Sequence, residues 1–127
     1  MSKKKILIVD DEVAFTEMVK LNLEATGNYT VKIQNDASKA VHSVLSYRPD
    51  LILLDIIMPE AEGPDVVYQI RKNEDIRDTP IIFLTATVTR DEVNAENGKI
   101  GGHKFLAKPS TVGELINCIE RQLSLKL

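Results

Sequence analysis

The chain has 127 residues and a mass of 14.2 kDa, the size of one ordinary domain that buries a core without disulfides or structural metal. It is 43% hydrophobic and 28% charged, and it has no apolar run near the roughly 20 residues of a membrane-spanning helix. A net charge of -3 does not provide the basic surface that nucleic-acid binding requires. We therefore expect one soluble domain over residues 1–127, with no direct contact to nucleic acid or membrane.

The compartment is indicated by the N-terminal residues and by the cysteine content. Lys3, Lys4 and Lys5 lead straight into an apolar run, Ile6 to Val9, that is too short for the core of a secretion signal. The single cysteine, Cys118, allows no internal disulfide and has no second thiol for a cysteine-based metal site. We expect a cytoplasmic protein in which Cys118 is an inert thiol on a helix.

Five short apolar runs alternate with helix-like segments along the chain. The expected strands are Lys5 to Asp10, Tyr29 to Gln34, Asp50 to Asp55, Pro80 to Thr85 and His103 to Ala107. The first, third and fourth runs are continuously apolar, which is typical of central parallel strands with helices on both faces. The alternation predicts an α/β fold, a doubly wound (βα)5 sandwich.

The intervening segments have the apolar spacing of amphipathic helices. The apolar face expected in the first helix consists of Ala14, Met18, Leu21 and Ala25, and that in the last helix of Val112, Leu115, Ile116, Ile119 and Leu123. Gly27 is expected to end the first helix, and Pro64 to lie in the first turn of the third. Thr111-x-x-Glu114 resembles a capping box that opens the last helix. The fourth helix, about Thr89 to Asn97, is so polar that its bounds are poorly defined.

Charged and hydroxyl residues end the strands at the edge where open α/β sheets hold their functional sites. Asp10 and Asp11 end the first strand, Asp55 the third, Thr85 the fourth, and Lys108 the fifth. Two carboxylates about 4 Å apart repel by about 4 kcal/mol at an effective dielectric constant of about 20, so three close carboxylates need compensating positive charge. Lys108 supplies one charge and a divalent cation would supply two more. Oxygen ligands without His or Cys at ligand spacing suit Mg²⁺ or Mn²⁺.

This set of residues favours phosphoryl chemistry, because Mg²⁺ binds phosphate oxygens together with a few carboxylates. A carboxylate can attack phosphorus while a metal ion, an ammonium group and a hydroxyl group hold the transferred oxygens. Asp55 is the best-placed nucleophile, since it stands alone at the end of a central strand. Asp10 and Asp11 are adjacent and better suited to share the metal.

These residues, in this order, resemble the receiver domains of two-component response regulators, including the single-domain chemotaxis type, over nearly the whole chain. The matching motifs are Asp10-Asp11, Asp55 with Met58-Pro59 and Gly63, Thr85-Ala86, Phe105 and Lys108-Pro109. The resemblance implies a flavodoxin-like sheet of five parallel strands in the order 2-1-3-4-5. It also implies that Asp55 accepts a phosphoryl group, with Mg²⁺, from a phosphohistidine on a sensor histidine kinase or a histidine phosphotransfer protein. Such a domain is a signalling phosphoacceptor that assists its own phosphorylation and dephosphorylation, not a conventional enzyme.

The resemblance also assigns ligands around the phosphorylation site. Asp11, Asp55 and the backbone carbonyl of Ile57 would be direct metal ligands. Asp10 would be a ligand through water. Lys108 would pair with the phosphoryl oxygens.

A switch is implied as well. The Thr85 hydroxyl and the Ala86 N–H would bind the phosphoryl group, and Phe105 would turn into the space that Thr85 leaves. The phosphate would thereby stabilise one of two packings. The fourth helix, fifth strand and fifth helix would then present a changed surface to a downstream effector protein or domain.

Three alternatives remain open beside this interpretation. A phosphatase with an aspartate nucleophile uses similar carboxylates. Members of that family have a DxD motif after the first strand, whereas this chain has Asp10-Asp11-Glu12 at that position. A flavin-binding module of the same topology needs a phosphate cradle that these acids would repel. A receiver-like scaffold could bind partners without phosphorylation. Gly101-Gly102-His103-Lys104 departs from the residues usual before Phe105, which leaves the output surface open.

Overall fold

One mixed sheet organises the computed structural model, which describes residues 3–55, 63–85, 99–100, 103–107 and 111–126. Its six strands lie in the order β2-β1-β3-β4-β6-β5. The strands are β1 (Lys4–Val9), β2 (Tyr29–Gln34), β3 (Leu51–Asp55), β4 (Ile81–Thr85), β5 (Lys99–Ile100) and β6 (His103–Ala107). The helices are α1 (Val13–Ala25), the short 3-10 helix η1 (Ala37–Lys39), α2 (Ala40–Tyr47), α3 (Gly63–Arg71) and α5 (Val112–Lys126).

The predicted fold class is confirmed. The strands β2, β1, β3, β4 and β6 are parallel neighbours in the predicted order, with β6 as the fifth predicted strand. The sheet has one strand more than expected, because β5 pairs antiparallel with β6 at the edge. Two residues are too few to show an alternating pattern, so the sequence carried no signal for β5. The helix predicted at about Thr89 to Asn97 lies outside the described residues.

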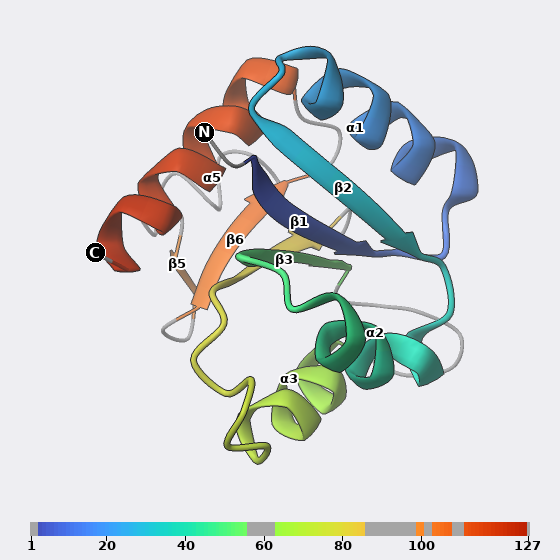
Figure 1. Cartoon of the computed structure of the whole chain (residues 1–127), viewed down its shortest axis with the longest axis vertical. Helices are drawn as coiled ribbons and strands as arrows, with labels where there is room; N and C mark the ends of the chain where they lie inside the picture. Colours follow the sequence, from blue (N-terminus) through green and yellow to red (C-terminus); the bar gives the residue numbers. More distant parts are fainter. Residues whose placement is uncertain (1–2, 56–62, 86–98, 101–102, 108–110, 127) are drawn as a thin grey trace.

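Helices cover both faces of the sheet, with α1 and α5 on one face and α2 and α3 on the other (Figure 1). Successive strand residues point to opposite faces. In β1, Leu7 and Val9 join the core beneath α2 and α3, whereas Ile6 and Ile8 join the core beneath α1 and α5. All four side chains are 0% exposed. The continuous apolar runs therefore reflect two cores, one on each side of the sheet.

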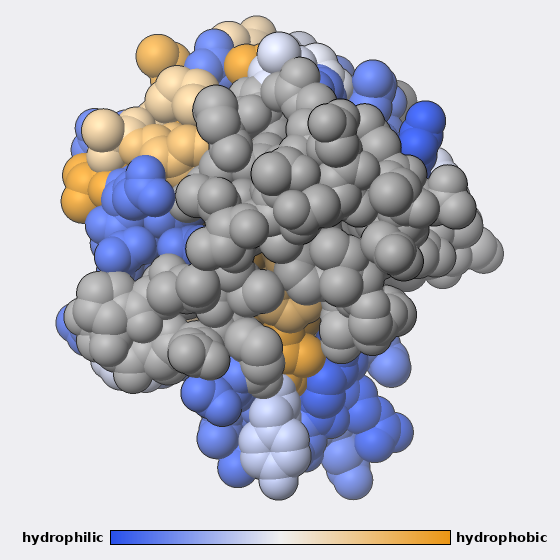
Figure 2. All heavy atoms as spheres, turned by 180° about the vertical axis from the view of Figure 1, so that it is seen from behind, coloured by the Kyte–Doolittle hydropathy of each residue, from blue (hydrophilic) through white to orange (hydrophobic). Residues whose placement is uncertain are grey.

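The apolar face predicted for the first helix is wrong. Met18 and Leu21 are 40% and 72% exposed in α1, and Ala14 and Ala25 are exposed as well. The side chains that α1 buries are Thr16, Val19 and Leu23. Figure 2 shows hydrophobic side chains exposed at its upper left, over α1.

The error has a physical cause in Thr16. A hydropathy pattern treats threonine as polar and so rejects the face that contains it. In the structure the Thr16 hydroxyl donates to the Val13 carbonyl (2.8 Å) and accepts a hydrogen bond from the Asn35 amide (3.1 Å). Because its polar atom is satisfied, Thr16 can lie in the core.

The face predicted for the last helix is confirmed in α5. Ile116 and Leu123 are partly buried and pack against the core on that side of the sheet. The fully packed positions are Leu115, Cys118 and Ile119. Cys118 lies on a helix, as expected, and its side chain is buried there.

The predicted helix termini are also confirmed. The Glu114 N–H donates to Thr111 Oγ1 (3.1 Å), and the Thr111 N–H donates to Glu114 Oε1 (3.3 Å), which is a capping box at the start of α5. Gly27 follows α1 with a φ of 81°. Pro64 lies in the first turn of α3. Among the described helices, none is both long enough and apolar enough to cross a membrane.

Candidate functional site

Three carboxylates meet at the carboxyl ends of β1 and β3. Asp10 and Asp11 directly follow β1, and Asp55 is the last residue of β3. One carboxylate oxygen from each residue lies within 4.8 Å of the other two. The two strands are parallel neighbours with Val9 opposite Leu54, so their next residues, Asp10 and Asp55, lie side by side. The sheet topology therefore brings together the three acids that the strand ends pointed to.

The three acids differ in their exposure to solvent. Asp10 is 0% exposed and Asp55 is 6% exposed, whereas Asp11 is exposed. The N–H of Glu12 donates to Asp10 Oδ1 at 2.9 Å. Two buried carboxylates next to a third would repel each other strongly in a medium of low polarity. The cluster is therefore suited to a cation that reaches it from the side of Asp11.

The donor atoms fit a hard divalent cation. Asp10, Asp11 and Asp55 offer carboxylate oxygens, with neither imidazole nor thiolate among them. Mg²⁺ in proteins is held by one or two carboxylates, and it keeps waters that phosphate oxygens can replace. These three residues could hold Mg²⁺ with coordination positions left for a phosphate.

The structure describes two of the remaining predicted site residues, Thr85 and Phe105. Asp55 pairs with Leu84 across β3 and β4, so Thr85, the last residue of β4, follows the partner of Asp55. Phe105 lies in β6 opposite Phe83. Their roles in a switch stay predictions. The predicted residues that lie outside the described part of the chain are Ile57, Ala86 and Lys108.

One residue at this edge was not predicted from the sequence. Asn35 directly follows β2, and its Nδ2 donates to the Asp10 carbonyl at 2.7 Å and to Thr16 Oγ1 at 3.1 Å. Val9 of β1 pairs with Gln34 of β2 on one side and with Leu54 of β3 on the other. The residues that come next in the three strands, Asp10, Asn35 and Asp55, are therefore neighbours at the carboxyl ends of the strands. The available signal was an amide residue directly after the strand that neighbours the first acidic strand.

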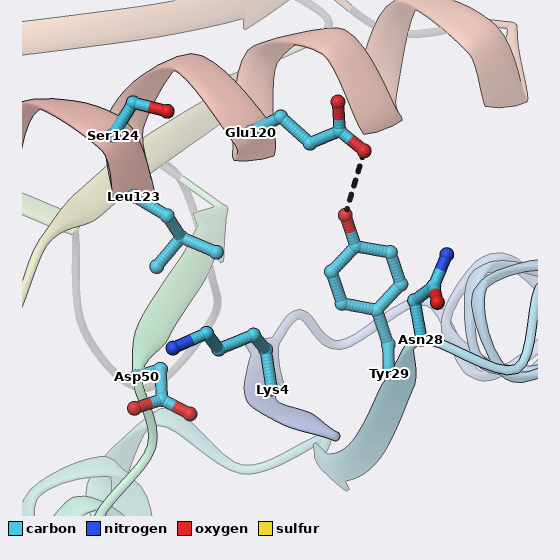
Figure 3. A pocket seen from close by; sticks show the side chains of 7 residues that line it. All are labelled: Lys4, Asn28, Tyr29, Asp50, Glu120, Leu123 and Ser124. Carbon is cyan, nitrogen blue, oxygen red and sulfur yellow. Dashed lines mark hydrogen bonds between the residues drawn. The ribbon is translucent and has the colours of Figure 1, made fainter. Parts of the chain in front are cut away.

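A separate pocket of about 600 Å³ lies at the opposite end of the strands, where β1 and β2 begin (Figure 3). Its lining residues are Lys4, Asn28, Tyr29, Asp50, Glu120, Leu123 and Ser124. The Tyr29 hydroxyl donates to Glu120 Oε1 at 3.5 Å. Burial of the ring, followed by the neighbouring Glu120 carboxylate, raises the pKa of Tyr29 above its usual 10.0. No lining residue belongs to the acidic cluster, so this pocket is not part of the candidate site.

Comparisons with known proteins identify what the chain is similar to. A family model described as the response regulator receiver domain matches residues 6–120. The response regulator MprA of Mycobacterium ulcerans is 37% identical over 114 residues, which cover 88% of this chain and 47% of that protein. The DNA-binding dual master transcriptional regulator RpaA of a Synechocystis species is 34% identical over 113 residues, covering 88% and 46%. The chain thus spans about half the length of these relatives.

A solved structure matches this chain over nearly its full length. The chemotaxis protein CheY4 of Vibrio cholerae superimposes with a TM-score of 0.80 at 28% sequence identity. The superposition covers 95% of this chain and 99% of that one. The similarity therefore extends over nearly the whole chain.

Proposed function

This chain belongs to the response regulator receiver domains of two-component systems, and on that premise we propose that residues 1–127 form a single receiver domain phosphorylated on Asp55. The donor is a phosphohistidine on a sensor histidine kinase or a histidine phosphotransfer protein, and the reaction requires Mg²⁺. The observation that carries the proposal is the meeting of Asp10, Asp11 and Asp55 within 4.8 Å at the carboxyl edge of the sheet.

The chemistry is a displacement at phosphorus. A carboxylate oxygen of Asp55 attacks the phosphoryl group, the P–N bond of the phosphohistidine breaks, and the imidazole leaves with that electron pair and takes up a proton. The product is an acyl phosphate on Asp55. The chain assists this step by holding the acceptor and the metal ligands in place, so it is a phosphoacceptor and not a conventional enzyme.

Bound Mg²⁺ would supply positive charge against the carboxylates and the transferred oxygens. We assign Asp11, Asp55 and the Ile57 carbonyl as direct ligands and Asp10 as a ligand through water. The exposure of Asp11 supports this assignment, because it leaves one side of the cluster open to solvent and to the donor. The Lys108 ammonium would pair with the phosphoryl oxygens.

The phosphorylated state is read out by a change in packing. The Thr85 hydroxyl and the Ala86 N–H bind the phosphoryl oxygens, and the ring of Phe105 occupies the space that Thr85 leaves. Strand register supports the first contact, since Thr85 directly follows Leu84, the partner of Asp55. The surface expected of the predicted fourth helix, β6 and α5 then binds a downstream effector.

The effector and the location follow from the same premise. We propose a cytoplasmic protein, because phosphohistidine donors of two-component systems act there. RpaA is described as DNA-binding, whereas CheY4 is a chemotaxis protein of about this length. The net charge of -3 favours an effector protein or domain, and not nucleic acid or membrane, as the direct partner of this domain.

The proposal is tested by incubating the protein with Mg²⁺ and acetyl phosphate and measuring the mass of the intact chain. We expect one added phosphate, which should not form when EDTA is present from the start to remove Mg²⁺ and should be absent from Asp55→Asn. Asp50→Asn is the matched control, since Asp50 precedes the same strand at its other end. A wild-type chain that gains no phosphate, or an Asp55→Asn chain that still gains one, would overturn the proposal and favour a scaffold that binds partners without phosphorylation.

A further inference from the structure

The amide of Asn35 contacts the backbone of the acidic site from the neighbouring strand. Its Nδ2 lies 2.7 Å from the Asp10 carbonyl and 3.1 Å from Thr16 Oγ1. We propose that Asn35 is a positioning residue that sets the direction of the Asp11 carboxylate and thereby the affinity of the site for Mg²⁺. The inference rests on the proposed function, since it concerns the same metal site.

The hydrogen bond to Asp10 acts on the peptide that joins the two adjacent acids. The Asp10 carbonyl belongs to the planar peptide unit whose nitrogen is that of Asp11, so fixing the oxygen fixes the plane from which the Asp11 side chain departs. Asp10 is fully buried and is held by the packing around it, whereas Asp11 is exposed. An exposed side chain is oriented mainly by its backbone. Its position within 4.8 Å of Asp55 therefore depends on this peptide.

The second hydrogen bond joins Asn35 to Thr16 in helix α1. Thr16 is 0% exposed, its hydroxyl donates to the Val13 carbonyl (2.8 Å), and its N–H donates to the Glu12 carbonyl (3.0 Å). A single nitrogen of Asn35 thus bridges the last residue before Asp11 and the first turn of the helix that follows. The segment that contains Asp11 is therefore held on one side at the Asp10 carbonyl and on the other at Thr16.

Asn35 is itself held in place by the residue before it. The Asp10 N–H donates to the Gln34 carbonyl at 3.1 Å, which extends the pairing of β1 and β2 by one residue. Gln34 Nε2 donates to Ser43 Oγ of α2 (2.8 Å), and Gln34 Oε1 accepts from the Asp36 N–H (3.0 Å). The segment that carries Asn35 is therefore anchored to α2 and cannot drift from the site without breaking these bonds.

The chemistry requires an amide at this position. The two acceptors, a carbonyl and a hydroxyl oxygen, need two hydrogens from one donor atom, which the NH₂ group of asparagine provides. A carboxylate of the same shape has no hydrogen to donate when ionised and adds a negative charge beside three others. The added charge would itself attract a cation, so Asn35→Asp combines two opposed effects. We therefore expect metal affinity to fall in the two uncharged variants, Asn35→Ala and the nearly isosteric Asn35→Leu.

The test measures metal binding directly in the unphosphorylated protein. Mn²⁺ is titrated into each variant and the free ion is counted by electron paramagnetic resonance. Asn35→Ala should raise the dissociation constant about 3- to 10-fold, the effect of one or two lost hydrogen bonds. The matched control is Asn22→Ala, because the Asn22 amide also donates to a carbonyl, that of Met18 (2.8 Å), but on the exposed side of α1. That variant should bind Mn²⁺ like wild type.

Two further measurements distinguish a positioning role of Asn35 from a general loss of folded structure. Circular dichroism at the temperature of the titration checks that each variant is folded. The nearly isosteric, uncharged Asn35→Leu provides a second variant if Asn35→Ala unfolds. At saturating Mg²⁺ the rate of labelling by acetyl phosphate should return to the wild-type value in Asn35→Ala, because Asp55 is unchanged. Binding by both Asn35 variants within twofold of wild type would refute the inference alone. A wild-type protein that binds no Mn²⁺ would instead refute the proposed function.

Discussion

Thr16 and Tyr29 show how single polar groups are accommodated inside this chain. Thr16 is 0% exposed, and its hydroxyl both donates and accepts a hydrogen bond. Tyr29 is 4% exposed, and its hydroxyl reaches Glu120 at the edge of a pocket. In both residues the apolar part of the side chain is buried while the polar atom finds a partner, as the burial of polar groups requires.

For Tyr29 this arrangement predicts a loss of stability at alkaline pH. Burial, and then the Glu120 charge, raises the pKa of the folded-state phenol above 10.0, so the unfolded chain ionises first as the pH rises. The stabilisation by the neutral ring is thus fully present below pH 10.0 and is lost above it. Urea unfolding at about pH 8 and about pH 10.5 should show a smaller loss for Tyr29→Phe than for wild type.

The control for that experiment is Tyr68→Phe, which changes a tyrosine that is 66% exposed on α3. This substitution should leave the alkaline loss of stability as it is in wild type. Equal losses in wild type and Tyr29→Phe would mean that burial of Tyr29 does not contribute to the pH dependence.

At the scale of elements, one glycine, Gly27, follows the end of α1 and another, Gly113, lies in the first turn of α5, in different conformations. Gly27 has a φ of 81°, in the left-handed region, and a Cβ added there would meet nothing within 4 Å. Gly27→Ala should therefore destabilise the protein by about 1 kcal/mol through backbone conformation alone. The measurement is the free energy of unfolding in urea.

Gly113→Ala is the matched substitution in the first turn of α5. The added Cβ would lie 3.9 Å from Thr111 Oγ1, an ordinary contact, and the residue is helical. Here we expect a gain of about 0.5 kcal/mol, because alanine restricts the unfolded chain and favours the helix. Effects of the same sign at both positions would contradict the argument from φ.

The elements themselves could be predicted to the extent that their signals are local. The five predicted strands were found within a residue, and three of them, β1, β3 and β4, show the unbroken apolar runs that burial on both faces requires, whereas the two-residue β5 was missed. The buried face of α1 was missed because it depends on Asn35, which satisfies Thr16 from another strand. The three acids could be predicted from strand ends, whereas Asn35 could not, since its partner is a backbone carbonyl and its position depends on the register of β1 and β2.

On the scale of the whole molecule, repulsion within the acidic cluster lowers the stability of the folded state. Folding brings Asp10, Asp11 and Asp55 within 4.8 Å of one another, whereas the unfolded chain keeps Asp55 far from the other two. The repulsion destabilises the metal-free protein, and a cation that binds the folded state alone restores stability by mass action. Function and stability are therefore linked through Mg²⁺.

The linkage predicts opposite effects of one substitution in two buffers. Without Mg²⁺, Asp11→Asn should be more stable than wild type by about 1 kcal/mol, a value reduced by solvent screening because Asp11 is exposed. With Mg²⁺ in excess, wild type should gain stability and Asp11→Asn should gain less. Thermal unfolding in EDTA and in Mg²⁺ measures both effects.

A control must remove the same charge without touching the cluster, and Glu17→Gln on the exposed side of α1 does so. Because net charge alone acts over long range and is screened by salt, this variant should retain the wild-type response to Mg²⁺. If Glu17→Gln and Asp11→Asn shift the melting temperature equally in EDTA, the stabilisation comes from net charge and not from the cluster. If wild type melts at the same temperature in both buffers, the three acids do not bind Mg²⁺ in the folded state.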